Sequence, residues 1–254
     1  MIRLELISAG YGKKTVLSDV SASFNKGETV GIIGPNGCGK STLLKAVAGL
    51  IPLSSGKVTV DGVPVDSMKK RDTARKISLL PQGHTADDMT VLDTVLLGRF
   101  PHLDFPKIYR EADRKAAADA IAQMGLAGYE SARLNDLSGG MRQNAYVAMA
   151  LAQNAEYILL DEPTTYLDVS HRQNLSDTLK RLSASGRGII TVLHDLPLAF
   201  EMCDRLVIMN DGKAVAFGTP EEVLTSDVIT DVFGVRLGRC TSGGFTAYYY
   251  ERSV

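Results

Sequence analysis

The residues from Gly34 to Thr42 have the composition of a loop that binds phosphate. Their sequence, Gly-Pro-Asn-Gly-Cys-Gly-Lys-Ser-Thr, fits the pattern G-x-x-x-x-G-K-S/T. Small residues let the backbone curl so that its N–H groups point at phosphate oxygens. Lys40 would contact the β and γ phosphates of a nucleotide, and Ser41 would place its hydroxyl on Mg²⁺. We therefore expect nucleotide binding through Gly34, Pro35, Asn36, Gly37, Cys38, Gly39, Lys40, Ser41 and Thr42.

The residues on either side of this loop favour that interpretation over a glycine-rich turn that matches by chance. Residues 29–33 form a short apolar run, which predicts a buried strand. Residues 43–49 predict a helix that ends at Gly49. A phosphate-binding loop requires a strand before it and a helix after it, and the dipole of that helix adds positive potential at the same place.

Two carboxylates follow another apolar run, and they could hold a cation or activate water. Residues 157–160 predict a buried strand that ends in Asp161 and Glu162. Burying a carboxylate without a partner is costly. Because successive side chains of a strand point to opposite faces, Asp161 could bind Mg²⁺ while Glu162 faces a water molecule. The alternative is a polar strand end that faces solvent.

Two more polar side chains follow predicted strands. Gln82 comes just after residues 77–80, and His194 comes directly after residues 188–193. Ligands of open α/β sheets bind at the carboxyl ends of the strands, so both side chains could reach one site. Either residue could instead be incidental, since a polar residue often caps a loop.

A glycine pair stands at the start of another predicted helix, which runs to Gln153. Ser138 precedes the pair and suits the N-cap position. Gly139 and Gly140 are costly inside a helix, so they suggest that the backbone closely approaches a ligand.

The remaining pattern mixes strands and helices in separate regions. Residues 84–150 lack strand signals and contain predicted helices at 90–98 and 107–124, which indicates a helical insertion in an α/β chain. We expect a turn at 54–56 and hairpin turns at Gly10-Tyr11-Gly12, Asp61-Gly62 and 210–213. A terminal hairpin is expected around residues 241–244. The other expected strands cover residues 2–9, 15–24, 57–60 and 205–209.

The composition sets limits on function. The chain has 254 residues, of which 44% are hydrophobic and 22% charged, as in ordinary globular proteins. Its net charge of −1 provides no general attraction to nucleic acid, and we expect no nucleic-acid partner. No apolar run approaches the roughly 18 residues of a membrane span. The 3 cysteines lack metal-ligand spacing, which suggests a reducing compartment.

Taken together, these motifs resemble those of the ATP-binding subunit of an ABC transporter, over nearly the whole chain. Residues 34–42 match Walker A, and residues 157–162 match Walker B with its catalytic glutamate. Met141 stands where the signature motif usually has Gln, and Asn144 where relatives usually have Arg. The other matches are Gln82 to the Q-loop, Leu137–Met141 to the signature, Thr165-Tyr166-Leu167-Asp168 to the D-loop, His194 to the switch histidine, and Tyr11 to the aromatic residue that stacks on adenine.

The resemblance implies an α/β fold of P-loop NTPase (RecA-like) type, with an antiparallel β-subdomain and an inserted α-helical subdomain. Residues 1–254 would form a single ABC ATPase domain. Within it, residues 1–83 and 154–254 would make the nucleotide-binding core with the β-subdomain. Residues 84–153 would make the helical subdomain that carries the signature motif.

The resemblance also implies an ATPase mechanism with ATP and Mg²⁺ as cofactors. Two copies of the chain would pack head to tail, and each ATP would lie between Walker A of one copy and Ser138, Gly139 and Gly140 of the other. Glu162 would polarise the attacking water, and His194 would contact the γ-phosphate. Asp161 and Ser41 would hold Mg²⁺, and Gln82 would sense the metal.

A finer resemblance concerns the transported substrate. Residues 79–82, 98–102 and 161–168 look like those of importers of ferric siderophores, haem or vitamin B12. Such importers combine two permease subunits, two ATPases and an extracytoplasmic substrate-binding protein, which places this chain at the cytoplasmic face of a bacterial membrane. The alternatives are a soluble ABC ATPase of the cluster-assembly type and a small-molecule P-loop kinase. The kinase would not need the Leu-Ser-Gly-Gly string.

Overall fold

A central sheet organises the computed structural model, which describes residues 1–83, 88–165, 167–242 and 245–251. The sheet has 6 strands in the order β10-β9-β3-β8-β7-β6. All neighbouring pairs are parallel except β9 with β10. The strands are β3 (Thr29–Ile33), β6 (Ile77–Leu80), β7 (Tyr157–Asp161), β8 (Gly188–Val192), β9 (Arg205–Asn210) and β10 (Lys213–Gly218).

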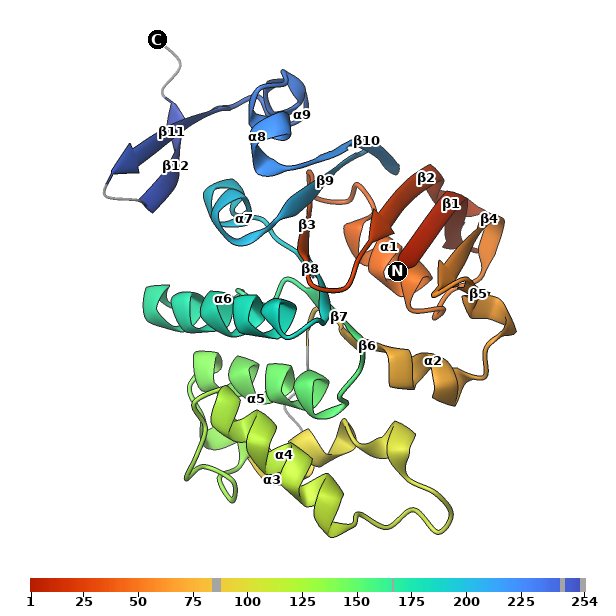
Figure 1. Cartoon of the computed structure of the whole chain (residues 1–254), viewed down its shortest axis with the longest axis vertical. Coiled ribbons are helices and arrows are strands. Elements are labelled where there is room, and N and C mark those ends of the chain that lie inside the picture. Colours follow the sequence, from red (N-terminus) through yellow and green to blue (C-terminus); the bar gives the residue numbers. More distant parts are fainter. Residues whose placement is uncertain (84–87, 166, 243–244, 252–254) are drawn as a thin grey trace.

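Both faces of this sheet are buried, which explains why its strands are continuous apolar runs. Every residue of β3, β7 and β8 is buried. Alternate residues enter two different cores: Ile158 and Leu160 pack in one, and Tyr157 and Leu159 in the other. Figure 1 shows α1 (Lys40–Val47) on one side of the strands, and α6 (Val169–Ala184) and α7 (Leu196–Met202) on the other.

A second, antiparallel sheet packs against the α1 side. Its order is β2-β1-β4-β5, formed by β1 (Ile2–Tyr11), β2 (Lys14–Phe24), β4 (Leu53–Val60) and β5 (Val63–Pro64). The Asp61-Gly62 hairpin is confirmed, since Val60 pairs with Val63.

Two expected turns in this sheet are wrong. Tyr11 belongs to β1 and pairs with Lys14, so the tight turn falls one residue later than expected. Residues 54–56 lie inside β4 rather than in a turn. Gly56 has a positive φ of 77° and lies opposite a β-bulge in β1, where Leu6 and Ile7 face this one residue; a Cβ atom on Gly56 would lie 2.3 Å from the carbonyl oxygen of Leu6.

The helical subdomain lies below the sheet in Figure 1 and consists of α3 (Val91–Leu97), α4 (Glu111–Gln123) and α5 (Gly139–Ala152). Helix α4 starts later than the expected residue 107, and Asp113 in its first turn accepts a hydrogen bond from the backbone N–H of Arg110 at 3.0 Å. The described part of this region contains only the isolated bridge Thr90↔Arg133 and no strand. Among the described residues, no helix is both long and apolar enough to cross a membrane.

The remaining elements connect these layers. Helix α2 (Lys70–Lys76) precedes β6, and α8 (Pro220–Leu224) and α9 (Val228–Phe233) follow β10. The chain ends in the expected hairpin, β11 (Arg236–Ser242) and β12 (Phe245–Glu251), whose turn at 243–244 lies outside the described residues. Short 3-10 helices are η1 (Val65–Ser67), η2 (Phe100–His102) and η3 (Leu134–Asp136).

An ionic cluster joins the antiparallel sheet to the core. Asp61, in the β4–β5 turn, accepts hydrogen bonds from the Met1 amine at 2.6 Å and from Lys76 Nζ at 3.0 Å. Lys76 and Lys26 also pair with Glu156, just before β7. Burial would raise the pKa of Asp61, but these hydrogen bonds outweigh it and lower the pKa to about 2.

We expect the Asp61→Asn substitution to lower the free energy of unfolding by about 1–2 kcal/mol at pH 7, after allowance for partial exposure. The pKa of Asp61 is lowered by folding, so its contribution is present above the unfolded value of 3.8 and is lost as the pH falls toward about 2. Urea unfolding of both proteins from pH 7 to pH 3 measures this. A difference that does not shrink in acid would contradict the ionic origin.

Candidate functional site

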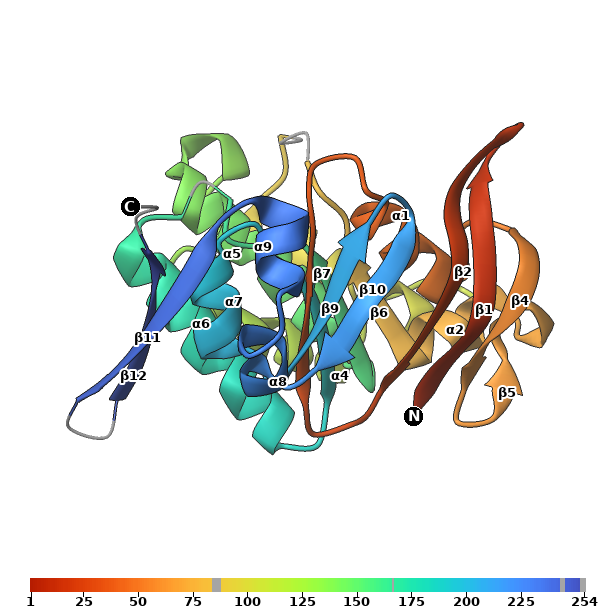
Figure 2. The same cartoon turned by 90° about the horizontal axis from the view of Figure 1, so that it is seen from above.

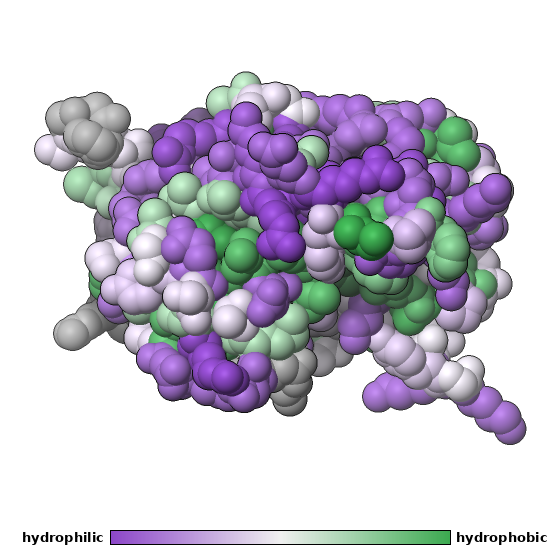
Figure 3. Space-filling view, turned by 90° about the horizontal axis from the view of Figure 1, so that it is seen from below, coloured by the Kyte–Doolittle hydropathy of each residue, from purple (hydrophilic) through white to green (hydrophobic). Residues whose placement is uncertain are grey.

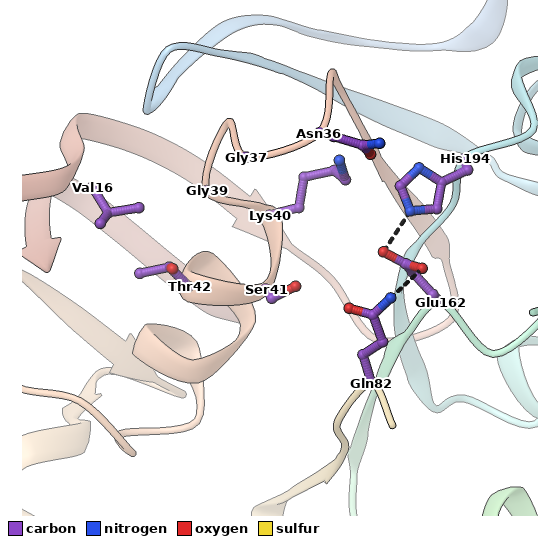
Figure 4. A pocket seen from close by; sticks show the side chains of 10 residues that line it. All are labelled: Val16, Asn36, Gly37, Gly39, Lys40, Ser41, Thr42, Gln82, Glu162 and His194. Carbon is purple, nitrogen blue, oxygen red and sulfur yellow. Dashed lines mark hydrogen bonds and ion pairs between the residues drawn. The ribbon is translucent and has the colours of Figure 1, made fainter. Parts of the chain in front are cut away.

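A cavity of about 770 Å³ opens at the carboxyl ends of the parallel strands (Figure 4). The loop after β3 lines one wall, and the residues that follow β6, β7 and β8 line the other. This volume is within the usual range of about 300–1,000 Å³ for small-molecule sites. The lining residues are Val16, Asn36, Gly37, Gly39, Lys40, Ser41, Thr42, Gln82, Glu162 and His194.

The loop from Gly34 to Gly39 requires glycine at particular positions. A Cβ atom at Gly34 would lie 2.3 Å from the carbonyl oxygen of Met209. Gly39 has φ 104° and is the N-cap of α1, where a Cβ would lie 2.9 Å from Leu17 Cδ2. Helix α1 therefore begins directly at the cavity, and the N–H groups of its first turn are free to bind an anion.

Lys40 places a positive charge within this loop. Its side chain is buried, at 5% exposure, and Nζ donates hydrogen bonds to the carbonyl oxygens of Gly34 at 2.8 Å and Pro35 at 2.9 Å. Both carbonyl groups are uncharged, and among the described residues Nζ has no carboxylate as a hydrogen-bond partner. A buried ammonium without a counter-charge attracts an anion, so Lys40 and the loop amides together suit a phosphate group.

Asp161 and Ser41 meet beside the loop. Ser41 Oγ donates a hydrogen bond to Asp161 Oδ1 at 3.1 Å, and Asp161 is only 3% exposed. Burial raises the pKa of Asp161, while the Ser41 hydrogen bond opposes this rise. A divalent cation would compensate this buried carboxyl group.

The oxygen atoms at this position fit Mg²⁺, which is typically held by one or two carboxylates together with substrate phosphates and water. Within the described ranges, no group of three His, Cys, Asp or Glu side chains could hold a metal. The remaining ligands would therefore come from the Ser41 hydroxyl, the Gln82 amide and the bound nucleotide.

Glu162, which follows β7, contacts one polar residue after each of two other strands: Gln82 after β6 and His194 after β8. Its Oε2 accepts a hydrogen bond from Gln82 Nε2 at 2.6 Å, and its Oε1 pairs with His194 Nε2 (Figure 4). The carboxylate faces Lys40 and Ser41 across the cavity. A group that can accept a proton therefore lies opposite the loop that suits phosphate.

The reason that Asp161 and Glu162 take different partners is not the one expected. Strand β7 ends at Asp161, and Glu162 has a positive φ of 55°, outside strand geometry. Strand alternation therefore does not orient Glu162. A positive φ at a residue other than glycine typically costs about 1–3 kcal/mol, and such strain is often found at functional sites.

The residues of the Leu-Ser-Gly-Gly string do not line this cavity. Ser138 is the N-cap of α5, and its Oγ accepts a hydrogen bond from Met141 N at 3.3 Å. A Cβ atom at Gly140 would make only ordinary contacts, 3.6 Å from His171 Cγ. Gly139 lines a second cavity of about 660 Å³ beside α5, which shares Gln82 and Glu162 with the first. Packing within one chain therefore gives no reason for glycine at position 140.

Other predicted residues lie at the border of the site. Tyr11 is 49% exposed and is not part of the cavity wall, so its contact with adenine stays a prediction. Gly34 and Pro35 act through the carbonyl oxygens that bind Lys40. Cys38 is buried, which raises the pKa of its thiol. Tyr166 of the expected D-loop lies outside the described residues.

Val16 is a further residue of the cavity wall that was not expected from the sequence. This residue of β2 lines the cavity, and its Cγ1 would lie 3.3 Å from a Cβ atom at Gly39. No local pattern indicates this role, because Val16 reaches the site only when the antiparallel sheet packs on α1.

Comparison with known proteins agrees with this geometry. Residues 17–165 match the family model described as ABC transporter. The ferric enterobactin transport ATP-binding protein FepC of Escherichia coli is 39% identical over 92% of this chain and 88% of its own length.

Two solved structures extend the comparison. A chain of an inward-facing metal-chelate type ABC transporter superimposes with a TM-score of 0.84 and 25% identity, over 99% of this chain and 97% of its own. A dimeric bacterial ABC transporter cassette superimposes with a TM-score of 0.77 and 28% identity, over 87% of this chain and 99% of its own. The chain therefore belongs to the ABC transporter family, as one of its ATP-hydrolysing, ATP-binding subunits.

Proposed function

We propose that this ATPase powers an importer of a metal chelate, such as a ferric siderophore or cobalamin. The observation that carries the catalytic part is the position of Glu162, which faces Lys40 and Ser41 while holding Gln82 and His194. The likeness to a ferric enterobactin transport protein and to a metal-chelate type transporter supports the substrate class. Both relatives favour transport over a soluble cluster-assembly ATPase.

In the proposed reaction, the loop amides and Lys40 bind the β and γ phosphates of ATP. Glu162 accepts a proton from a water molecule, whose oxygen attacks the γ-phosphorus as the bond to the β–γ bridging oxygen breaks. His194 donates a hydrogen bond to a γ-phosphate oxygen. Ser41, Gln82 and Asp161 would hold Mg²⁺, which would supply positive charge to neutralise the phosphates. The protein thus acts by positioning and by electrostatic stabilisation.

The same proposal involves a change in the Glu162 contacts. Both carboxylate oxygens of Glu162 have a protein partner, Gln82 or His194. Each oxygen can accept a further hydrogen bond, so a water molecule can bind Glu162 beside these partners. The γ-phosphate and Mg²⁺ offer new partners to His194 and Gln82, so nucleotide binding would free the carboxylate for its role as a base.

We further propose that two copies complete each site. Ser138, Gly139 and Gly140 are absent from the wall of the nucleotide cavity, and Ser138 is exposed on the surface of the helical subdomain. In a head-to-tail pair, the amides at the start of α5 would reach the γ-phosphate bound by the other chain. The likeness to a dimeric cassette supports this arrangement.

The proposed partners include two permease subunits in the membrane and, indirectly, an extracytoplasmic substrate-binding protein. The helical subdomain exposes large apolar side chains that a partner could cover: Leu97, Phe100, Phe105 and Ile108. Figure 3 shows apolar patches among polar side chains on the face seen from below, where this subdomain lies. We therefore place the chain at the cytoplasmic face of the membrane.

We expect Ser138→Arg to leave ATP binding by a single chain unchanged and to abolish hydrolysis, because the bulky cation would block the start of α5 from the other chain's phosphates. Equilibrium binding of a fluorescent ATP analogue and steady-state phosphate production measure the two effects. Ser131→Arg, at an exposed position of the same subdomain, is the matched control. Loss of ATP binding by the Ser138→Arg monomer would contradict the two-chain site.

A further inference from the structure

The C-terminal hairpin packs beside the short helix that follows His194. Strand β12 contacts α7, while β11 contacts α9. Figures 1 and 2 show the hairpin beyond α7 and α9, at the edge of the molecule. Strands β11 and β12 form a 2-stranded sheet separate from both larger sheets. The hairpin is therefore attached to the core through side-chain packing and a few hydrogen bonds rather than through shared strand pairing.

Tyr248 makes the main contact. Its ring packs against Phe200 of α7 with centroids 5.2 Å apart, and its backbone N–H donates to Glu201 Oε1 at 3.4 Å. Two residues further along β12, the Tyr250 hydroxyl lies near the backbone of Leu196, the first residue of α7. The same face of β12 thus contacts both ends of α7.

Helix α7 has only 7 residues, and a helix this short is unstable without tertiary contacts. It begins next to the site, since its N-cap Asp195 follows His194 and accepts a hydrogen bond from Leu198 N at 3.1 Å. Any shift of α7 would therefore move the backbone that carries His194.

We infer that the C-terminal hairpin positions His194 for hydrolysis by fixing α7 through Tyr248 and Tyr250. His194 would be the residue that contacts the nucleotide, and the two tyrosines would act through it. The inference rests on the role proposed above for His194. The hairpin would act on the site indirectly, because it lies outside the wall of the nucleotide cavity.

The chain offers an internal control, because Tyr249 lies between these two tyrosines and points to the other face of the hairpin. Its ring covers Gly238 of β11, where a Cβ atom would lie 2.4 Å from Tyr249 Cζ. Tyr249→Ala therefore removes the same side chain from the same strand without removing a contact to α7. Tyr248→Phe keeps the ring that packs on Phe200 and should restore normal behaviour.

The experiment compares Tyr248→Ala, Tyr248→Phe and Tyr249→Ala in the full chain. The chain has 4 histidines, so the His194 Cε1–H signal can be assigned by its absence in His194→Asn. We expect Tyr248→Ala to shift and broaden this signal and to lower kcat about 10- to 100-fold with little change in ATP affinity, as a misplaced catalytic group does. The other two variants should behave as wild type.

A His194 signal that is unchanged in Tyr248→Ala, or equally changed in Tyr249→Ala, would overturn the inference. If the signal moves in Tyr248→Ala alone but kcat does not fall, the tyrosine still positions His194, and the role proposed for His194 in hydrolysis is wrong. Because the signal is read without turnover, the two failures can be told apart. A parallel thermal melt checks that each variant remains folded.

Discussion

Glu162→Gln should lower the rate of ATP hydrolysis by about 10²–10⁴-fold, or roughly 3–5 kcal/mol of barrier, while ATP remains bound. Glutamine keeps the size and hydrogen bonding of glutamate but cannot accept a proton. The substitution also removes a negative charge near the γ-phosphate, so ATP affinity should hold or rise. Rapid-quench measurement of phosphate formation, beside equilibrium binding of ATP, separates the two effects.

Two variants show whether this effect is specific to Glu162. Glu111→Gln makes the same chemical change at the exposed start of α4 and should hydrolyse ATP normally. Asp161→Asn should also be slow, but for a different reason, because it weakens Mg²⁺ binding and with it the bound state. Hydrolysis at the wild-type rate by Glu162→Gln would rule out the proposed base.

Lys40→Ala should weaken ATP binding at least about 30-fold, since losing one partner of a buried charge pair costs about 2–5 kcal/mol. In the free protein Lys40 Nζ bonds only to the carbonyl oxygens of Gly34 and Pro35 among the described residues, so the fold should survive its removal. Isothermal titration with ATP measures the affinity, and a thermal melt measures the fold.

Lys115→Ala provides the matched control for the loss of a lysine, because Lys115 is exposed on α4, far along the chain from the loop. Its affinity for ATP should equal that of the wild type. An unchanged affinity in Lys40→Ala would show that the loop after β3 does not bind the phosphates.

The buried strands, and the polar residues that follow them at one sheet edge, could be predicted from the sequence because their signals are local. Strands β3 and β6 have the expected bounds, since strands buried on both faces read as short apolar runs. The expected groups Lys40, Glu162 and His194 do line one cavity, because the carboxyl ends of parallel strands meet at one sheet edge.

The features that the sequence did not reveal depend on contacts between distant segments. Gly56 has the signature of a turn, yet it lies within β4, opposite a bulge in β1. Val16 enters the site only through packing of the antiparallel sheet on α1. The positive φ of Glu162 and the packing of Tyr248 on Phe200 likewise have no local pattern.

The claim that each site is shared between two chains is tested most directly by mixing two inactive variants. Lys40→Ala keeps an intact Ser138, and Ser138→Arg keeps an intact phosphate-binding loop. A dimer with one chain of each kind would have one complete site, formed by the loop of the Ser138→Arg chain and the α5 start of the Lys40→Ala chain.

The measurement is steady-state ATP hydrolysis by each variant alone and by their equimolar mixture, with an affinity tag on one chain to verify that mixed dimers form. We predict that each variant alone is inactive and that the mixture regains activity, up to one site per mixed dimer. A mixture that contains mixed dimers but is no more active than the two variants measured separately would contradict the shared site.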